Sequence, residues 1–229
     1  MKNAKEILDF YILSGITDIT SDTPFGLKKT NNTGVDSIES AKQISLKAQN
    51  IDELLKSIKE FNNCALKQTS SHTILGTGNQ SAQYMIIIDA PGDDDERSGK
   101  ILSGKSGEFI KNFLKALKIQ ENECFFSPLL PWRPPGNRAP TQLEADTCWP
   151  FLEKQISLIS PKKIFVFGIE PAQILSKTKK TINQLRENKI IYQTTTGTNI
   201  EIIPSLSINY MMFNPIQKAK LWDFLIKCD

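Results

Sequence analysis

The apolar run at residues 84–88 ends in a carboxylate that could do chemistry. The run is short, continuous and rich in β-branched residues, as a strand buried on both faces of a parallel sheet should be. Asp89 follows it directly, and a turn of sequence Ala-Pro-Gly comes next. A carboxylate at a strand end can polarise a water molecule for attack on a substrate. Asp89 is therefore the candidate catalytic residue, whereas the acidic run at 93–96 is more simply a solvated loop.

Residues 99–106 have the sequence GKILSGKS, which matches the phosphate-loop pattern G-x-x-x-x-G-K-S. Such a loop binds a nucleotide when its glycines join a strand directly to a helix. Here Gly99 lies ten residues past Asp89, and the apolar run 162–167 ends in Gly168 rather than in a magnesium-binding Asp. A nucleotide-binding loop is thus a distant alternative. The free amides that open the next helix, with Lys105, could instead hold one backbone phosphate.

The proline-rich loop 131–140, of sequence PWRPPGNRAP, is a third candidate. The chain has only four Arg, and two of them, Arg133 and Arg138, lie in this loop. Arg forms planar, bidentate hydrogen bonds to phosphate that Lys cannot reproduce, and prolines stiffen a loop. A rigid connector with two solvated Arg is the simpler alternative. We expect a polyanion contact instead, because a stiff loop with Arg and an aromatic residue suits a ligand-binding edge.

Bulky apolar residues also follow the last predicted strand, in the segment 204–215. Their simplest role is to complete the core. They could also form an exposed wedge of the kind that enters a base stack in proteins that bend nucleic acid or flip bases. Both alternatives remain open from the sequence.

The elements that must position these residues alternate between strands and helices. Apolar runs predict four strands, at 84–88, 124–130, 162–167 and 199–203, and helical patterns lie between them and after the last. This order predicts an α/β fold with three layers, α/β/α, around a mostly parallel four-stranded sheet. Ligands in such sheets bind beyond the carboxyl ends of the strands, where the candidate segments lie.

Two further predictions concern the ends of elements and of the chain. Thr141 and Glu144 form a capping-box pattern at a helix start, and Asp52 could cap an earlier helix. Residues 2–13 have helical spacing, whereas residues 19–45 are polar and weakly periodic. We therefore predict an N-terminal extension at 1–45, with a helix and an irregular arm, followed by a domain at 46–229.

The composition excludes several classes of protein. A net charge of +3 over 229 residues permits nucleic-acid binding without demanding it. No stretch approaches the ~20 apolar residues of a membrane span, so no membrane contact is expected. The single His, His72, excludes most His-based catalytic schemes. Four scattered cysteines without a CxxC pair suggest reduced thiols in the cytoplasm. The chain is expected to be a monomer.

These segments, in this order, resemble the family 4 (iron–sulfur type) uracil-DNA glycosylases and their alphaproteobacterial relatives. The resemblance covers roughly residues 50–228. It rests on FNNCALKQTSSHTILGTG at 61–78, the Asp-Ala-Pro-Gly turn at 89–92, residues 99–107, the Arg-Pro-Pro-Gly-Asn-Arg loop, and a last helix from Pro215 with Lys218 and Trp222. It implies the fold of that family, DNA as partner, and hydrolysis of the N-glycosidic bond of a flipped uracil. The DNA-binding residues expected from the motifs are Gly104, Lys105, Ser106, Arg133, Asn137, Arg138, Tyr210 and Met211.

The resemblance also implies a base pocket, with several replaced residues. Asp89 stands for the family's water-positioning Glu, Leu102 for a stacking Phe, Pro128 for a base-reading Asn, and Ser207 for a His. The implied pocket residues are Ala90, Pro91, Gly92, Leu102, Pro128, Ser207 and Asn209. Loss of the Asn weakens recognition by hydrogen bonds, and loss of the His removes a donor to the leaving base. Two hypotheses therefore remain, a glycosylase with a remodelled pocket and a non-catalytic DNA-binding relative.

A metal cofactor is not expected. The family's four-iron cluster needs four Cys ligands. By the resemblance, Cys64 and Cys148 fall on two of those positions, while Phe61 and Trp132 occupy the other two. Because two thiolates cannot hold a four-iron cluster, we predict that the chain has none.

Overall fold

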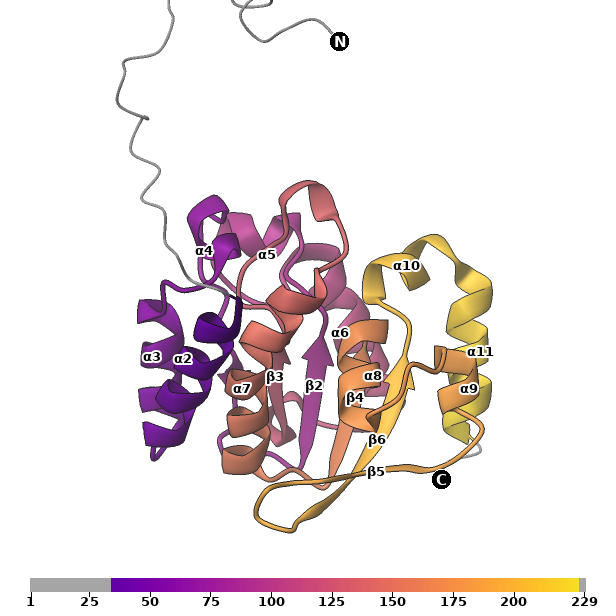
Figure 1. Cartoon of the computed structure of the whole chain (residues 1–229). Coiled ribbons are helices and arrows are strands. Elements are labelled where there is room, and N and C mark those ends of the chain that lie inside the picture. Colours follow the sequence, from indigo (N-terminus) through magenta and orange to yellow (C-terminus); the bar gives the residue numbers. More distant parts are fainter. Residues whose placement is uncertain (1–33, 227–229) are drawn as a thin grey trace, which may run out of the picture. The chain divides into compact units, whose positions relative to one another are not determined.

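The computed structural model describes residues 34–226 (Figure 1). The helix predicted at 2–13 and Cys228 lie outside these residues. The strands are β1 (Thr77–Gly78), β2 (Tyr84–Ile88), β3 (Cys124–Pro128), β4 (Lys163–Phe167), β5 (Ile190–Gln193) and β6 (Asn199–Ser205). The helices are α2 (Gly34–Lys47), α3 (Ile51–Glu60), α4 (Ala65–Thr69), α5 (Asp93–Ser98), α6 (Gly104–Ala116), α7 (Gln142–Ile159), α8 (Ile169–Ser176), α9 (Ile182–Leu185), α10 (Ile208–Phe213) and α11 (Pro215–Ile226).

The sheet has six strands in the order β1-β3-β2-β4-β6-β5. The four predicted strands are its centre, and they are all parallel, in the order β3-β2-β4-β6. The prediction of four strands was too low, because β1 and β5 pair antiparallel at the two edges. β1 has only two residues and β5 alternates between buried and exposed positions, so neither has the continuous apolar pattern of a central strand.

The two faces of the sheet bury different sets of side chains, which confirms the three-layer α/β/α architecture. In β2, Met85 and Ile87 pack into a core with α2, α3 and α7. Ile86 and Ile88 point to the other face and pack with α6, α10 and α11. This alternation follows from the period of two of a strand. Figure 1 shows α2 and α3 on one side of the sheet and α11 on the other.

Part of the predicted irregular arm is a helix. α2 covers residues 34–47 and packs against α7. Its buried face consists of Ser37, Ala41 and Ser45, which are small rather than apolar and large. Small residues let two helices approach closely, but they leave no hydrophobic stripe for a sequence pattern to detect.

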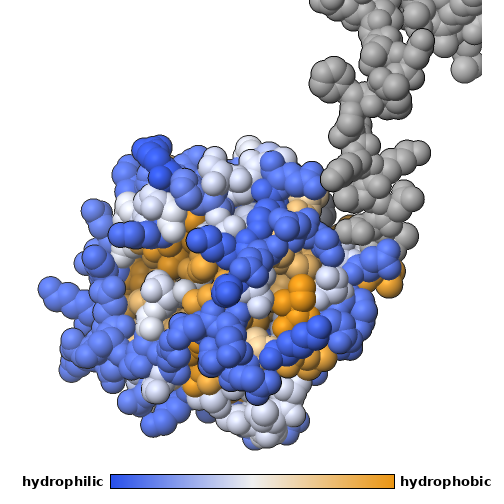
Figure 2. All heavy atoms as spheres, turned by 90° about the vertical axis from the view of Figure 1, so that its left-hand side faces the viewer, coloured by the Kyte–Doolittle hydropathy of each residue, from blue (hydrophilic) through white to orange (hydrophobic). Residues whose placement is uncertain are grey.

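Helix starts agree with the capping rules, with one difference. Thr141 and Glu144 form the predicted capping box of α7. The cap of α3 is Asn50, whose side chain accepts from the backbone N–H of Glu53 at 2.9 Å, so Asp52 lies in the first turn instead of capping it. Within residues 34–226, no helix is both long and apolar enough to span a membrane. The side of the molecule that carries α2 and α3 is mainly hydrophilic, with apolar residues in separate patches (Figure 2).

Candidate active site

A cleft of about 940 Å³ opens at the carboxyl ends of the parallel strands. Its walls come from the turn after β2, the start of α6, the proline-rich loop, the start of α8, α9 and α10. This is the edge where strand-end ligands bind in open α/β sheets. The predicted site residues that line it are Asp89, Ala90, Pro91, Gly92, Leu102, Lys105, Ser106, Asn137, Arg138, Ser207, Asn209 and Tyr210. The sequence prediction thus placed most of its candidates around one cavity.

Asp89 lies at the cleft end of the central strand β2. Its backbone N–H donates to the carbonyl of Phe167 at 3.1 Å, and its carbonyl accepts from Leu130 N–H at 3.1 Å. The neighbouring strands therefore fix its backbone from both sides. Its side chain is partly exposed to the cleft, and its Oδ1 accepts from the backbone N–H of Ala90 at 2.9 Å. Burial raises the pKa of this carboxyl to about 6, and the nearby negative charge of Glu170 acts in the same direction.

Gly168 lets the end of β4 approach Asp89. Its φ is +143°, a region that side chains rarely adopt. A Cβ at this position would lie 2.7 Å from the Cβ of Asp89 and 3.1 Å from its Cγ. Gly168 therefore has a steric role, since any side chain here would displace the carboxyl group.

Asp95 holds the turn after β2 against the start of α6. It is buried, and its carboxylate accepts from Gly92 N–H at 2.9 Å and from Ser103 N–H at 2.6 Å. Burial raises the pKa of Asp95 against the effect of these hydrogen bonds. The acidic run 93–96 was predicted to be solvated, and this part of the prediction was wrong for Asp95. The sequence could not distinguish Asp95 from the exposed Asp93 and Asp94, because only the fold places two backbone N–H groups around it.

The phosphate-loop pattern lacks the context that a nucleotide site requires. Gly99 ends α5 and Gly104 begins α6, so the segment joins two helices rather than a strand to a helix. The side chain of Asp94 packs against Gly104, since a Cβ at this glycine would lie 2.1 Å from Oδ2 of Asp94. Leu102 lines the cleft and Lys105 is exposed at its rim. Both residues are thus accessible to a ligand in the cleft, as their predicted roles require.

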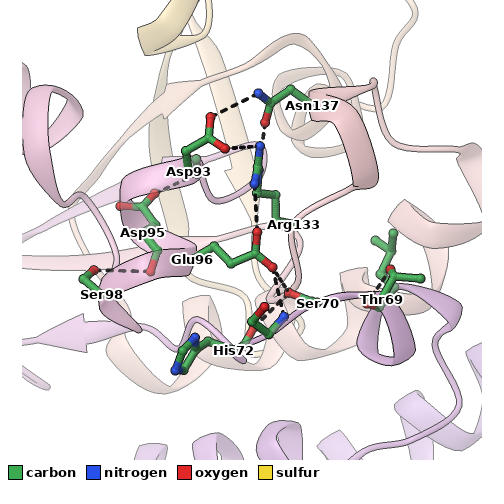
Figure 3. A network of polar contacts seen from close by, with 12 residues as sticks. Thr69, Ser70, His72, Asp93, Asp95, Glu96, Ser98, Arg133 and Asn137 are labelled. Carbon is green, nitrogen blue, oxygen red and sulfur yellow. Dashed lines mark hydrogen bonds and ion pairs between the residues drawn. The ribbon is translucent and has the colours of Figure 1, made fainter.

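Arg133, which was predicted to contact DNA phosphate, is paired within the protein, so it can reach a phosphate only by sharing or leaving its carboxylate partners (Figure 3). Its guanidinium forms ion pairs with Asp93 and, at 2.8 Å, with Glu96. Its Nε donates to Asn137 Oδ1 at 2.8 Å, and Asn137 donates in turn to Asp93 at 3.3 Å. Arg133 and Asn137 therefore hold the proline-rich loop to α5. We name this set of residues (Asp93, Glu96, Arg133 and Asn137) the rim network.

Arg138 is also paired. It donates to both carboxylate oxygens of Glu144, at 2.9 and 2.6 Å, in a bidentate arrangement. This pair lowers the pKa of Glu144, which also accepts from Thr141 N–H in the capping box of α7. Arg138 remains 43% exposed and lines the cleft, so it can reach a ligand only by sharing or leaving Glu144.

The apolar residues of α10 divide between the core and the surface. Met211, which was predicted to contact DNA, is fully buried and accepts from the hydroxyl of Ser205, so its side chain is not accessible in this structure. Tyr210 is 49% exposed and Phe213 is 85% exposed, and both line the cleft. Ser207 caps α10 by accepting from Tyr210 N–H at 3.4 Å, which leaves its own O–H free to donate. The exposed bulky residues of this segment at the cleft are therefore Tyr210 and Phe213.

One predicted pocket residue does not line the cleft, and several cleft residues were missed. Pro128 is buried at the end of β3 and is not among the residues that line the cleft. Glu170, Thr181, Asn183, Phe213 and Gln217 line it but were not predicted. Glu170 follows β4 by three positions, so the strand-end rule that identified Asp89 could have identified it.

The positions that the resemblance assigns to cluster ligands do come together. Cys64 and Cys148 are buried, and a hydrogen bond from Cys148 lowers the pKa of the Cys64 thiol. Phe61 stacks on Trp132 with ring centroids 6.3 Å apart. Trp132 is fully buried, and its Nε1 donates to Thr73 Oγ1 at 3.0 Å. Only two of the four positions carry a thiol, and among residues 34–226 no group of three or more His, Cys, Asp or Glu could hold a metal ion, so this set does not fit a cluster that needs four thiolates.

A comparison with models of protein families identifies the class of protein that has this fold and cleft. The model of the uracil DNA glycosylase superfamily matches residues 75–226, which include the cleft and all six strands of the sheet. The chain belongs to the uracil DNA glycosylase superfamily.

Within that superfamily, similar proteins are type-4 uracil-DNA glycosylases, which confirms the family resemblance. The protein from Archaeoglobus fulgidus is 28% identical over 127 residues, which are 56% of this chain and 64% of that protein. The protein from Saccharolobus solfataricus is 28% identical over 181 residues, 76% of this chain and 83% of that protein. A DNA polymerase of Bacillus phage SP01 is 27% identical over 124 residues, only 13% of its length. The match to the Archaeoglobus protein therefore covers less than two thirds of that relative.

Proposed function

We propose that this protein is a base-excision DNA glycosylase that hydrolyses the N-glycosidic bond of a uracil or related base flipped into the cleft. The observation that carries the proposal is Asp89, a partly exposed carboxyl fixed between two strands at the floor of a cavity. Membership of the superfamily and similarity to type-4 uracil-DNA glycosylases support it. In this proposal the protein acts as a monomer in the cytoplasm, and its partner is single- or double-stranded DNA.

In the proposed reaction, ionised Asp89 orients a water molecule toward C1′ of the deoxyribose. The bond from C1′ to the base breaks, and its electron pair leaves with the base. The water oxygen then bonds to C1′, and its proton passes to the carboxylate or to solvent. With a pKa of about 6, the carboxyl is mostly ionised at neutral pH and is still basic enough to accept that proton.

The cleft offers neutral donors for the departing base. Ser207 has a free O–H, and the amide of Asn209 is exposed at the same wall. Hydrogen bonds from preorganised donors stabilise developing negative charge on a leaving group. Neither residue is charged, so each is expected to give less stabilisation than a protonated side chain would. Leu102 can pack against the flipped base but cannot stack on it as an aromatic ring does.

Extrusion of a base leaves a gap in the duplex. Tyr210 and Phe213 project at the rim of the cleft, where an apolar wedge could fill that gap. The free energy needed to unstack a base is a few kcal/mol, and is lowest for a mismatched or single-stranded base. We therefore expect single-stranded or mismatched uracil to be preferred over uracil in a perfect duplex.

The second candidate function is a DNA-binding relative that has lost catalysis. The observation that favours it is Pro128, which has no side-chain amide and lies outside the cleft lining, at the position that the resemblance assigns to base reading. A site without that hydrogen bond discriminates less between bases.

One assay separates the two functions. Purified protein is incubated with uracil-containing single- and double-stranded oligonucleotides, and alkali-labile sites are measured. We expect cleavage that disappears in Asp89→Asn and persists in Asp94→Asn, a variant of an exposed cleft carboxyl. Salt-dependent DNA binding without any alkali-labile site would exclude the glycosylase and support the non-catalytic relative.

A further inference from the structure

Among the residues that the structure describes, the cleft has few unpaired positive charges that could bind the phosphates of a DNA backbone. The cleft is lined by five carboxylates, from Asp89, Asp93, Asp94, Asp95 and Glu170. Both arginines of the proline-rich loop are already paired with acidic residues. A phosphate that enters beside the flipped base therefore finds few available cations in the cleft itself, and the phosphates must be bound next to it.

A second groove, of about 360 Å³, adjoins the cleft between α6 and α11. Lys105 and Met212 line both cavities, so the two are neighbours. The groove also contains Lys218, whose Nζ lies 5.7 Å from the ring centroid of Phe109. In the part of the chain that the structure describes, neither lysine has an ion pair with a carboxylate. Figure 1 shows α11 next to α10, which carries the exposed wedge residues.

The floor of this groove is aromatic. Phe109 and Trp222 line it, and both are partly exposed. Trp222 rests on Phe113 with ring centroids 6.4 Å apart, and Phe109 packs edge-on against Phe167 at 6.2 Å. The core thus supports both rings from below, while part of each faces the groove. Aromatic faces flanked by lysines are the combination that binds single-stranded nucleic acid, because every base has a face that can stack.

We propose that the groove between α6 and α11 is a subsite for the nucleotide that flanks the flipped base on the same DNA strand. The base of that nucleotide packs on Phe109 and Trp222, and Lys105 and Lys218 bind the phosphates on either side of it. Glu108 and Asn112 also line the groove and can bond to the edge of the base. The inference rests on the proposed function for the identity of the base in the cleft.

The test measures whether the flanking nucleotide and the groove interact. Binding is followed by fluorescence anisotropy in the Asp89→Asn background, which blocks turnover. Two labelled oligonucleotides are compared, one with a uracil inside the strand and one truncated next to the uracil. We expect truncation to weaken binding about fivefold or more, as loss of one stacked base does. In Lys218→Ala the affinity for the longer strand should fall, and the effect of truncation should largely disappear.

The matched control is Lys220→Ala, on the same helix but absent from the groove lining. It has the same change in net charge, so a general electrostatic effect would appear equally in both variants. Lys218→Ala should also reduce the slope of log affinity against log salt by about 0.7, the value for one lost phosphate contact on a single strand. Lys220→Ala should leave the slope nearly unchanged.

Trp222 gives an independent readout. We expect DNA to quench tryptophan fluorescence, and the Trp222→Phe variant, which keeps a ring in the groove, to lose that quenching. Equal behaviour of Lys218→Ala and Lys220→Ala would overturn the subsite, and so would the absence of any DNA binding.

The glycosylase assay separates the two proposals. Release of uracil without coupling between the groove and the flanking nucleotide keeps the proposed function and overturns the subsite. Coupling between the groove and the flanking nucleotide without release of uracil keeps the subsite and overturns the proposed function.

Discussion

Substitution of Asp89 by Asn is expected to make the protein more stable at alkaline pH while it abolishes catalysis. The side chain keeps its shape, and the amide oxygen can still accept from Ala90 N–H. What changes is that a partly desolvated carboxyl can no longer ionise. The pKa of this carboxyl is raised from 3.8 to about 6 in the folded protein, mainly by burial.

The magnitude follows from that shift. A raised pKa means that folding favours the protonated form, so its contribution is complete below about pH 4 and is lost as the pH rises through 6. A shift of roughly two units corresponds to about 3 kcal/mol. Because the side chain is partly open to the cleft, water reduces this value. We therefore expect Asp89→Asn to be more stable than the wild type by about 1–2 kcal/mol at pH 8.

Urea unfolding of both proteins at pH 4 and pH 8 measures the difference. The advantage of Asp89→Asn should be present at pH 8 and mostly absent at pH 4. Asp223→Asn, an exposed change on α11, is the control for the loss of one negative charge. A variant that is less stable than the wild type at pH 8, or a difference that is the same at both pH values, would refute the description of Asp89 as a desolvated carboxyl.

Four further predictions follow from the site. Uracil release should fall by half as the pH decreases to about 6, because Asp89 must be ionised; a flat rate between pH 5 and 8 would contradict this. Asp95→Ala leaves two backbone N–H groups without an acceptor and should destabilise the protein by about 2–4 kcal/mol in urea unfolding. Gly168→Ala should cost about 2–3 kcal/mol and lower uracil release, whereas Gly197→Ala, also at positive φ but with open space around it, should cost less and leave release unchanged. Elemental analysis should find no stoichiometric iron, and chelators should not change the unfolding midpoint; a brown, iron-containing protein would exclude the prediction that the chain has no cluster. Trp132→Ala, by contrast, should lower the free energy of unfolding by about 3–5 kcal/mol, because this ring is fully buried.

The central sheet could be predicted because its strands are buried on both faces. Continuous apolar runs as short as 84–88 and 163–167 indicate buried strands, and their positions along the chain predict the arrangement of the whole domain. The edge strands and α2 could not be predicted for the opposite reason. β1 has two exposed residues, and α2 buries Ser37, Ala41 and Ser45, so neither has the apolar period that marks an element.

The site was predictable where position along a strand decides it. Asp89 and Ser207 follow strand ends, and parallel strands bring such residues to one edge. The ion pairs of Arg133 were not predictable, because its acidic partners lie 37 and 40 positions before it in the chain and contact it only in the folded protein. A six-residue helix such as α10 is too short for its sequence to show which face is buried. The wedge segment 204–215 was therefore identified, but Met211 was chosen as a DNA-binding residue and Phe213 was not.

The rim network has a consequence for the thermodynamics of the proposed DNA binding. Arg133 ties the proline-rich loop to α5 before any ligand arrives, so this wall of the cleft does not have to become ordered on association. The entropy lost on binding should then come mainly from the DNA rather than from the protein. The heat capacity change should match the surface buried, without the excess that accompanies coupled folding. Removal of Arg133 would transfer part of that ordering to the binding step and slow association.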